Sequence, residues 1–296
     1  MIRWLTRLGA ALARALPVSW LHAWGDAIGW LLFHLLASRR RLALQNMALI
    51  LGEQHDGRAR VRMLHASLRN MAKTMLELLK LPTMSEQQLV SLTPARGVEH
   101  LEEAVSRGKG VIVVTAHFGS WELLAARISQ LGYPLTVIAR DANDPPTAQI
   151  IRQARESAGV RVAERHEVRR VLRALRRGEV VGILPDQHGG DAGIWVAFLG
   201  RPASTVSGPA ALAYHTGAAI VPGFARRRSD ERVDVYFLPA LELPDTGDRE
   251  ADVRHVTEMI NDVMGEQIRR YPAQWMWMHN RWRTPPSLEH PEPVAT

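Results

Sequence analysis

Residues 111–122 read Val-Ile-Val-Val-Thr-Ala-His-Phe-Gly-Ser-Trp-Glu, and this stretch predicts the fold class. Its first four residues are β-branched and follow Gly108 and Gly110, which indicates a strand buried on both faces of a parallel sheet. Helical periodicity begins after Ser120, a favourable N-cap residue. His117 therefore falls in the turn between the carboxyl end of a strand and the amino end of a helix, where open α/β sheets bind their ligands.

The spacing of His117 and Glu122 has a geometric meaning. On one regular helix the two side chains would point in clearly different directions, because a turn takes about 3.6 residues. They can meet only if the histidine precedes the helix and the glutamate lies in its first turn, where the helix dipole favours a carboxylate. Such a pair is typical of a general base whose imidazole is held by a carboxylate. A capping glutamate beside a core histidine is the alternative that the spacing leaves open.

From about residue 97 onward, the chain alternates between predicted strands and predicted helices. This alternation predicts an α/β fold in which a largely parallel sheet is sandwiched by helices. No internal repeat is visible. The predicted strands are 111–114, 135–139, 160–163, 180–184, 218–224 and 233–238, and the predicted helices are 120–127, 147–158, 166–177, 204–216 and 252–270.

Length and composition limit the classes of protein to consider. The 296 residues suffice for one catalytic unit with appended segments. The absence of cysteine excludes disulfides, thiolate nucleophiles and cysteine metal sites together. The chain has 37 Lys and Arg residues against 30 Asp and Glu residues, a net charge of +7. This charge favours anionic lipids or an acidic carrier protein as partners, and no nucleic acid is expected because no recognised binding motif accompanies it.

An apolar segment near the amino terminus indicates contact with a membrane surface. Residues 15–38 contain no Lys or Arg, and arginines flank them on both sides. The segment is long enough to span a bilayer, but Asp26 interrupts it, at a cost of about 3 kcal/mol on insertion scales. We therefore expect a helix that lies in the membrane surface, and not a cleaved signal peptide. Its apolar face contains Trp20, Trp24, Ile28, Leu31 and Leu35.

A second amphipathic helix is predicted over residues 58–81, where Pro82 stops it. Its apolar stripe indicates a core face with solvated charges behind it, or else a basic and apolar platform over the site. We divide the chain into N-terminal membrane-associating helices (1–90), an α/β domain (91–284) and a loose, proline-rich tail (285–296).

The segment from His117 to Glu122 resembles the first motif of the glycerolipid-type lysophospholipid acyltransferases. The resemblance is strongest to the branch that contains the late, lauroyl- and myristoyl-type acyltransferases of lipid A biosynthesis and the acyltransferases of phosphatidylinositol mannosides. It runs over most of the chain, and the last motif is the most specific. The further matches, in family order, are Arg39-Arg40 with Asn46, Ala139-Arg140 with Asn143-Asp144-Pro145, Arg155, Leu184-Pro-Asp-Gln187 and Tyr271-Pro-Ala-Gln-Trp-Met-Trp-Met-His-Asn-Arg-Trp282.

The resemblance implies an enzyme that moves a fatty acyl group from an acyl carrier protein or coenzyme A thioester to a hydroxyl of an anionic membrane lipid. A lipid A precursor is the first expectation for the acceptor, and a phosphatidylinositol mannoside or a lysophospholipid is the alternative. The thioester is a co-substrate, and no cofactor is implied. The implied location is the cytoplasmic face of the bacterial inner membrane, as a peripheral protein or with a single N-terminal anchor. A non-catalytic basic protein that binds membranes or a carrier protein is the alternative of a different class.

The chemistry of acyl transfer assigns roles to the first motif. We expect His117 to act as general base and Glu122 to orient its ring and stabilise the imidazolium. Backbone N–H groups near Gly119 and Ser120, at the start of the predicted helix, are expected to hold the charge of the tetrahedral oxygen.

Three residues outside this motif are expected to bind the substrate. The resemblance places Asp186 beside the catalytic motif, although a turn-capping role is the alternative from its sequence context. It also assigns Arg140 and Arg155 to the phosphates of the lipid or the donor, because a guanidinium group binds phosphate at two points.

Other kinds of site are disfavoured. Several histidines fall near predicted turns, but none has a His-Glu-x-x-His or comparable ligand spacing, so no metal is expected. A serine hydrolase would need a Gly-x-Ser-x-Gly elbow, which does not occur. The tryptophans of the last motif predict either a core patch or a surface at the level of lipid headgroups, and we favour the second interpretation.

Overall fold

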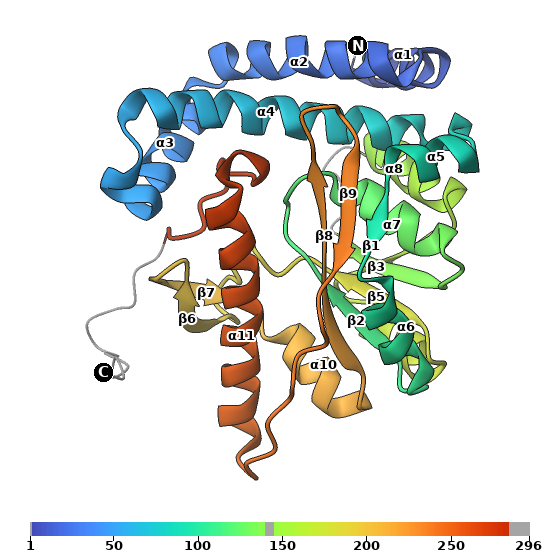
Figure 1. Ribbon diagram of the computed structural model, residues 1–296, viewed down its shortest axis with the longest axis vertical. Coiled ribbons are helices and arrows are strands. Elements are labelled where there is room, and N and C mark those ends of the chain that lie inside the picture. Colours follow the sequence, from blue (N-terminus) through green and yellow to red (C-terminus); the bar gives the residue numbers. More distant parts are fainter. Residues whose placement is uncertain (1, 140–144, 284–296) are drawn as a thin grey trace.

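The computed structural model describes residues 2–139 and 145–283, and its centre is a seven-stranded sheet (Figure 1). The strand order is β1-β9-β8-β2-β5-β3-β4, and every neighbouring pair is parallel except β8 and β9. The predicted largely parallel sheet is therefore confirmed. The strands are β1 (Ala95–Arg96), β2 (Val111–Val114), β3 (Leu135–Ala139), β4 (Val160–Glu164), β5 (Val180–Ile183), β8 (Ala219–Arg227) and β9 (Val233–Phe237).

Helices cover both faces of this sheet. Val111 and Val113 of β2 point toward α6, α7 and α8, whereas Ile112 and Val114 point toward α9, α10 and α11. Successive side chains of a strand face opposite sides, so a strand buried on both faces must be apolar at every position. The helices of the two layers, with the short α5, are α5 (Glu86–Leu92), α6 (Val98–Ser106), α7 (Trp121–Gln130), α8 (Pro145–Ser157), α9 (Val168–Arg176), α10 (Gly208–Thr216) and α11 (Arg249–Arg270).

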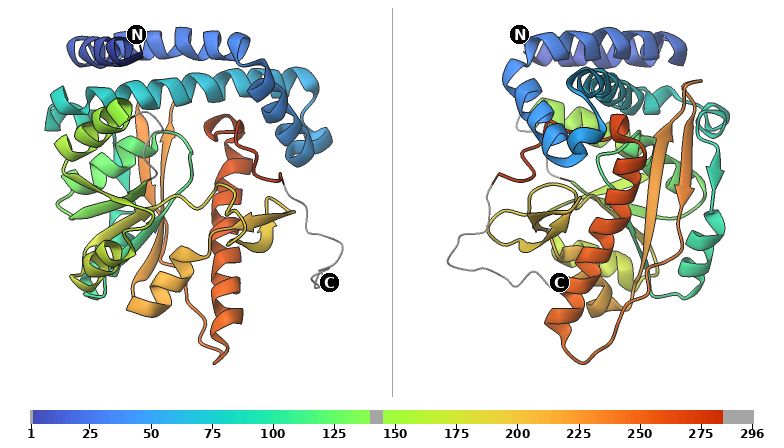
Figure 2. Two further views of the ribbon diagram at one scale, coloured as in Figure 1. Left: turned by 180° about the vertical axis from the view of Figure 1, so that it is seen from behind. Right: turned by 60° about the vertical axis from the view of Figure 1, so that its left-hand side comes forward.

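The N-terminal helices form a further layer across the carboxyl end of β2 (Figures 1 and 2). The long helix α4 crosses this edge, and α1 and α2 lie over α4 on the outside. The helix predicted over 58–81 is confirmed, and the apolar segment 15–38 contains one helix over 18–35, which is shorter because the chain breaks at Pro17 and at Leu36. In the part of the chain that the structure describes, no helix has the length and apolar character to cross a membrane. These helices are α1 (Ile2–Ala15), α2 (Val18–Leu35), α3 (Ala37–Leu51) and α4 (Gly57–Lys80).

Two glycines of α2 allow it to approach α4 closely. A Cβ atom on Gly25 would lie 3.1 Å from Lys73 Cα, and one on Gly29 would lie 2.5 Å from Arg69 Cα. The glycines are four residues apart and so lie on one face of α2. The opposite face points away from the protein and is apolar; there Trp20 is 61% exposed, with Trp24, Trp30, Leu31 and Leu35 also exposed.

The main departure from the predicted elements is a β-hairpin. We predicted a helix from residue 204, but β6 (Ile194–Phe198) and β7 (Arg201–Thr205) pair as an antiparallel hairpin before α10 begins. Leu199 and Gly200, both at positive φ, form its two-residue turn. The five residues of β6 are all apolar and do not alternate, and periodicity alone cannot assign so short a run to a strand.

The tryptophans of the last motif belong to the core. Trp275 and Trp277 are 1% and 0% exposed, and their rings contact each other at a centroid distance of 4.8 Å. Ser67 and Asn46 of the N-terminal helices donate hydrogen bonds to their backbone carbonyls. Our preference for a lipid-headgroup surface was therefore wrong for these two residues. The motif instead joins the N-terminal layer to the α/β domain.

Candidate active site

His117 lies in the turn between β2 and α7, as predicted. Strands β2 and β5 are neighbours, and Val114 pairs with Ile183 at their carboxyl ends. The segment that leaves β5 therefore brings Asp186 to the side of His117. Asp186 Oδ2 accepts a hydrogen bond of 2.9 Å from the backbone N–H of His117, and Oδ1 lies 2.9 Å from His117 Nδ1. Asp186 thus holds both the backbone and the ring of the histidine.

The surroundings of Asp186 set the protonation of the ring. Burial alone would raise the pKa of this carboxyl group, which is 1% exposed, but the charge of His117 and the hydrogen bonds from His117 and Trp275 outweigh burial and lower it. The Trp275 bond, from Nε1 to Oδ2, is 2.8 Å long. An ionised carboxylate can only accept hydrogen bonds, so Nδ1 of His117 carries a proton, and in the neutral ring the lone pair is on Nε2. This is the tautomer that a general base requires.

Glu122 lies in the first turn of α7, as predicted, but its partner is Arg155 on α8. Arg155 Nε donates to Oε2 at 2.9 Å and Nη2 donates to Oε1 at 2.6 Å. Trp121 Nε1 adds a bond of 3.1 Å to Oε1. The expected contact of Glu122 with His117 is therefore not the one that the structure makes. Glu122 is 3% exposed and turned toward α8, and the orienting position is taken by Asp186.

The residues expected to bind substrate have three different outcomes. Asp186 is in the site, but its carboxylate contacts His117, whereas we expected it to contact the substrate. Arg155 is also in the site, but Glu122 occupies two N–H groups of its guanidinium, which differs from the phosphate contact expected from the sequence. Arg140 lies outside the described residues.

The backbone groups expected to stabilise the oxyanion are already engaged. Gly119 N–H donates to Gln274 O and Ser120 N–H donates to Ala225 O, both at 2.9 Å. These bonds fix the turn against β8 and the last motif, so the expected oxyanion role of the two N–H groups does not fit the structure. The side-chain amide of Gln187 is a better candidate, since its Nε2 lies 3.5 Å from His117 Nε2 and faces the same cavity.

A cavity of about 860 Å³ opens beside His117. Residues of β2, β3 and β5 and of helices α7, α8, α9 and α10 form its wall, and most of this wall is apolar. Apolar cavities with a few convergent polar groups are typical sites for small or elongated organic ligands. A second cavity of about 430 Å³, at the other end of the strands, contains none of the groups around His117. The wall of the larger cavity includes Val113, Leu124, Ile128, Leu135, Val137 and Leu212, with His117, Glu122, Arg155 and Gln187 as polar members.

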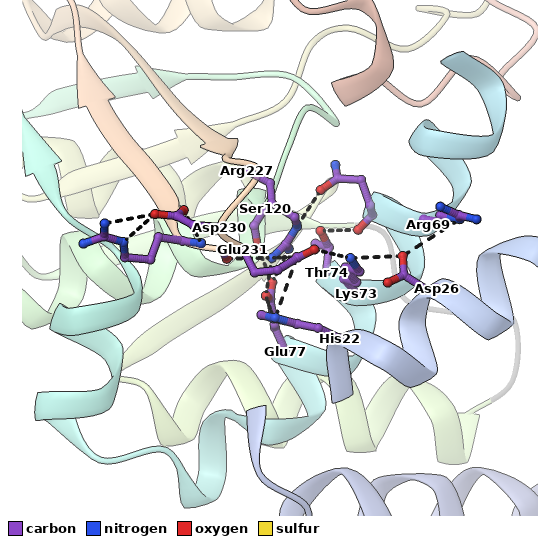
Figure 3. Close-up of polar contacts among 12 residues, drawn as sticks. His22, Asp26, Arg69, Lys73, Thr74, Glu77, Ser120, Arg227, Asp230 and Glu231 are labelled. Carbon is purple, nitrogen blue, oxygen red and sulfur yellow. Dashed lines mark hydrogen bonds and ion pairs between the residues drawn. The ribbon is translucent and has the colours of Figure 1, made fainter. Parts of the chain in front are cut away.

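The other side of the His117 loop (residues 115–120) faces a buried polar network (Figure 3). Glu77 of α4 is completely buried and accepts two hydrogen bonds of 2.7 Å from Arg227, at the end of β8. Ser120 Oγ and His22 Nε2 each lie 2.7 Å from the same carboxylate. Burial alone would raise the pKa of Glu77, but the charge of Arg227 and the bonds from His22 and Arg227 lower it to about 2. We did not predict this network from the sequence.

The described residues contain no cluster of metal-binding side chains. Within residues 2–139 and 145–283, no three His, Asp or Glu side chains converge as a metal site would require. His279, one of the histidines near predicted turns, accepts a hydrogen bond of 2.9 Å from the backbone N–H of His188. Burial lowers the pKa of His279 to about 4, so that it is neutral at ordinary pH.

Comparison with known proteins places the chain among acyltransferases. It matches the family model described as bacterial lipid A biosynthesis acyltransferase over residues 1–284. It is 26% identical to the lipid A biosynthesis lauroyltransferase of Escherichia coli K12 over 289 residues, 96% of this chain and 92% of that protein. The lipid A biosynthesis palmitoleoyltransferase of the same strain has the same identity and coverage. A phosphatidylinositol mannoside acyltransferase of Mycobacterium tuberculosis is 28% identical over 227 residues, 73% of this chain and 69% of that protein.

Proposed function

The chain belongs to the bacterial lipid A biosynthesis acyltransferase family, and we propose that it transfers a fatty acyl group from a thioester to a hydroxyl of an anionic glycolipid. Its relatives are acyltransferases of lipid A and of phosphatidylinositol mannosides, so the chain is an enzyme and not the non-catalytic protein considered above. For this chain we propose a lipid A precursor as acceptor and an acyl carrier protein or coenzyme A thioester as donor. A phosphatidylinositol mannoside or a lysophospholipid is the alternative acceptor.

The observation that carries this proposal is the cavity that ends at an oriented histidine. Its apolar wall fits a hydrocarbon chain, and His117 is part of that wall, so in this proposal the thioester carbonyl lies beside the histidine. Because Asp186 holds Nδ1, Nε2 is the nitrogen of His117 that can accept a proton, and its contact with Gln187 Nε2 is long, at 3.5 Å. No protein nucleophile is needed, because the acceptor hydroxyl can attack the thioester directly.

In the proposed reaction, His117 Nε2 removes the proton of the hydroxyl while its oxygen forms a bond to the carbonyl carbon. The resulting oxyanion is stabilised by the amide of Gln187, and the imidazolium is stabilised by Asp186. When the intermediate collapses, the carbon–sulfur bond breaks, and the departing thiolate takes the proton from His117. The histidine returns to its neutral form, and the products are an ester and a free thiol. The thioester is already activated, so the proposal requires no metal or other cofactor.

We further propose that the enzyme acts at the cytoplasmic face of the inner membrane, associated through α2. The support is the exposed apolar face of this helix, on which Trp20, Trp30 and Leu35 are 61%, 52% and 67% exposed. Amphipathic aromatic side chains are favoured at the level of lipid headgroups.

The experiment is a transfer assay with purified protein in detergent micelles. Dodecanoyl, tetradecanoyl and hexadecanoyl thioesters of acyl carrier protein and of coenzyme A would be offered with a lipid A precursor, a phosphatidylinositol mannoside or a lysophospholipid. Mass spectrometry should show one acceptor gaining the mass of one acyl chain, with release of one thiol. Release of thiol without acylation of any acceptor would contradict the proposal.

A further inference from the structure

We propose that Glu77 is a positioning residue for the His117 loop, and that it acts through Ser120. Its carboxylate lies behind the loop, on the side away from the cavity, and binds groups from α2, β8 and the loop itself (Figure 3). The inference rests on the proposed role of His117 as the base.

The carboxylate of Glu77 is saturated with donors. Oε1 lies 2.7 Å from Arg227 Nη1 and 2.7 Å from His22 Nε2. Oε2 accepts bonds of 2.7 Å from Arg227 Nη2 and from Ser120 Oγ. Four donors match the four lone-pair positions of an ionised carboxylate. The bond to Oε2 fixes the direction of the Ser120 side chain. Ser120 is three residues from His117, the proposed base.

The same face of α4 holds the residue next to Ser120. Thr74 Oγ1 donates to Gly119 O at 2.9 Å, and Asn70 Nδ2 donates to it at 3.2 Å. Gly119 has a φ of +57°, and a Cβ atom there would overlap the carbonyl oxygen of Ala225. Residues 70, 74 and 77 lie on one side of α4, because they are three and four residues apart. This side of the helix therefore hydrogen-bonds to two successive loop residues, 119 and 120.

None of these α4 residues can contact the substrate in the cavity. Glu77, Asn70 and Thr74 are at most 5% exposed, and none of them forms part of the cavity wall. Their influence on the reaction must pass through the position of the loop. A displacement of about 1 Å in a reacting group can lower a rate by about 100-fold.

Stability alone does not account for a buried ion pair at this point. Replacing such a pair with apolar residues of similar volume is often neutral or stabilising, because desolvation offsets the attraction between the charges. What apolar residues cannot supply is an acceptor for Ser120 Oγ. Glu77 and Arg227 are therefore best explained by the geometry that they impose.

The outer helix α2 meets the loop at this same carboxylate. His22 reaches Glu77 from α2, and Asp26, one turn later, lies 3.0 Å from Lys73 Nζ. Lys73 Nζ also lies 2.6 Å from Glu231. Helix α2, which has the exposed apolar face, therefore contacts through His22 and Asp26 the polar network that fixes Ser120 (Figure 3).

The test separates positioning from stability with two variants and one control. Glu77→Met with Arg227→Met removes both charges and keeps the volume apolar, while Ser120→Ala keeps the ion pair and removes only its link to the loop. The control, Asp234→Asn, breaks the ion pair of 2.6 Å that Arg226, the neighbour of Arg227, makes with β9. Asp234 has no contact with the loop among its hydrogen bonds and ion pairs in the described residues.

We expect both variants to fold and to lose about 10- to 100-fold in kcat, with KM changed by less than about twofold, because only the placement of the base is altered. The control should keep kcat within about twofold even if its melting temperature falls. Wild-type kcat in either folded variant would overturn the inference. If the double variant does not fold, Ser120→Ala alone decides.

Hydrogen exchange gives a readout that does not depend on turnover. Amide exchange in a peptide covering residues 116–122 should be faster in Ser120→Ala than in the wild type and unchanged in Asp234→Asn. Unchanged exchange in Ser120→Ala would overturn the inference even if the enzyme transfers acyl groups. Faster exchange in a protein without any transfer activity would support the inference and count against the proposed function.

Discussion

Two glutamate–arginine pairs lie on opposite sides of the His117 loop, one fully buried and one with a partly exposed arginine. Glu122 and Arg155 form the pair on the cavity side, and both residues are part of the cavity wall. Glu77 and Arg227 form the pair on the α4 side, with side chains 0% and 5% exposed and no contact with the cavity. The chemistry of the two pairs is the same. The comparison shows that position relative to the cavity decides whether an ion pair can meet the substrate or can only hold the groups that do.

The largest effect is expected on the cavity side. Replacing His117 with Ala should lower kcat by about two to four orders of magnitude, the usual range for the loss of a general base. His215→Ala is a matched control, because His215 lines the same cavity and has no carboxylate partner in the described residues. It should retain activity within about tenfold. If both variants fold normally and lose kcat to the same extent, His117 cannot be assigned as the general base.

The two pairs can be compared directly by neutralising each glutamate. Glu77→Gln should destabilise the protein by about 3–5 kcal/mol, because it removes the carboxylate that pairs with the buried Arg227, and Glu122→Gln should destabilise it less, because Arg155 is 18% exposed. Glu122→Gln should also lower kcat/KM by about one to two orders of magnitude, because the cavity wall loses the negative charge beside Arg155 and the nearby imidazolium becomes less favourable. In Glu77→Gln the loss should appear in kcat. Urea unfolding measures the loss of stability, and steady-state kinetics measure kcat and KM. A change in KM in Glu77→Gln alone would contradict the assignment of substrate contact to the cavity side and of positioning to the α4 side.

The sequence predicted one of these sides and missed the other for physical reasons. The run from Val111 to Val114 is buried on both faces, so its strand and the turn with His117 could be recognised from local pattern alone. That Asp186 and not Glu122 contacts the histidine depends on β5 being the neighbour of β2, which is a matter of strand order. Local spacing contains no information on that order.

The α4 side was missed because its members are far apart in the chain. Glu77 and Arg227 are separated by 150 residues, and His22 reaches them from a third element. A signal was present in the spacing of Asn70, Thr74 and Glu77, which places polar side chains on one helical face. From the sequence alone, a polar helical face is interpreted as exposed to solvent. Only the structure shows that these three side chains are buried against the loop.

A smaller effect is expected from acid. The pKa of Glu77 is about 2 in the folded protein and 4.5 without its partners, so its ionisation stabilises the fold above about pH 4.5. This contribution, about 3 kcal/mol, should be lost as the pH falls from 4.5 toward 2. Urea unfolding at pH 5 and at pH 2.5 would measure it. The wild type should lose more stability than Glu77→Gln over this interval, and equal losses would mean that the carboxylate is not held in its ionised form.

The smallest effect is expected on the outer face of α2. Changing Trp20 and Trp30 to Ser should weaken binding to anionic lipid vesicles by about tenfold, or about 1.4 kcal/mol, because rings at the headgroup level are only partly removed from water and contribute less than fully buried ones. Sedimentation with vesicles measures this binding. Transfer in detergent micelles should be unchanged, since neither residue reaches Glu77. A loss of micelle activity as large as the loss of vesicle binding would show that this face belongs to the site as well as to the membrane contact.

The most direct test of the proposed mechanism is the rate of a single turnover in Asp186→Asn. An amide at this position can still occupy the space, but it cannot stabilise the imidazolium or enforce the tautomer with a free Nε2. With enzyme in excess over the acyl thioester, we expect the rate of ester formation to fall by about 100-fold or more, while binding of the thioester is unchanged. A wild-type rate of ester formation in folded Asp186→Asn would contradict the assignment of His117 and Asp186 as the base and its orienting partner.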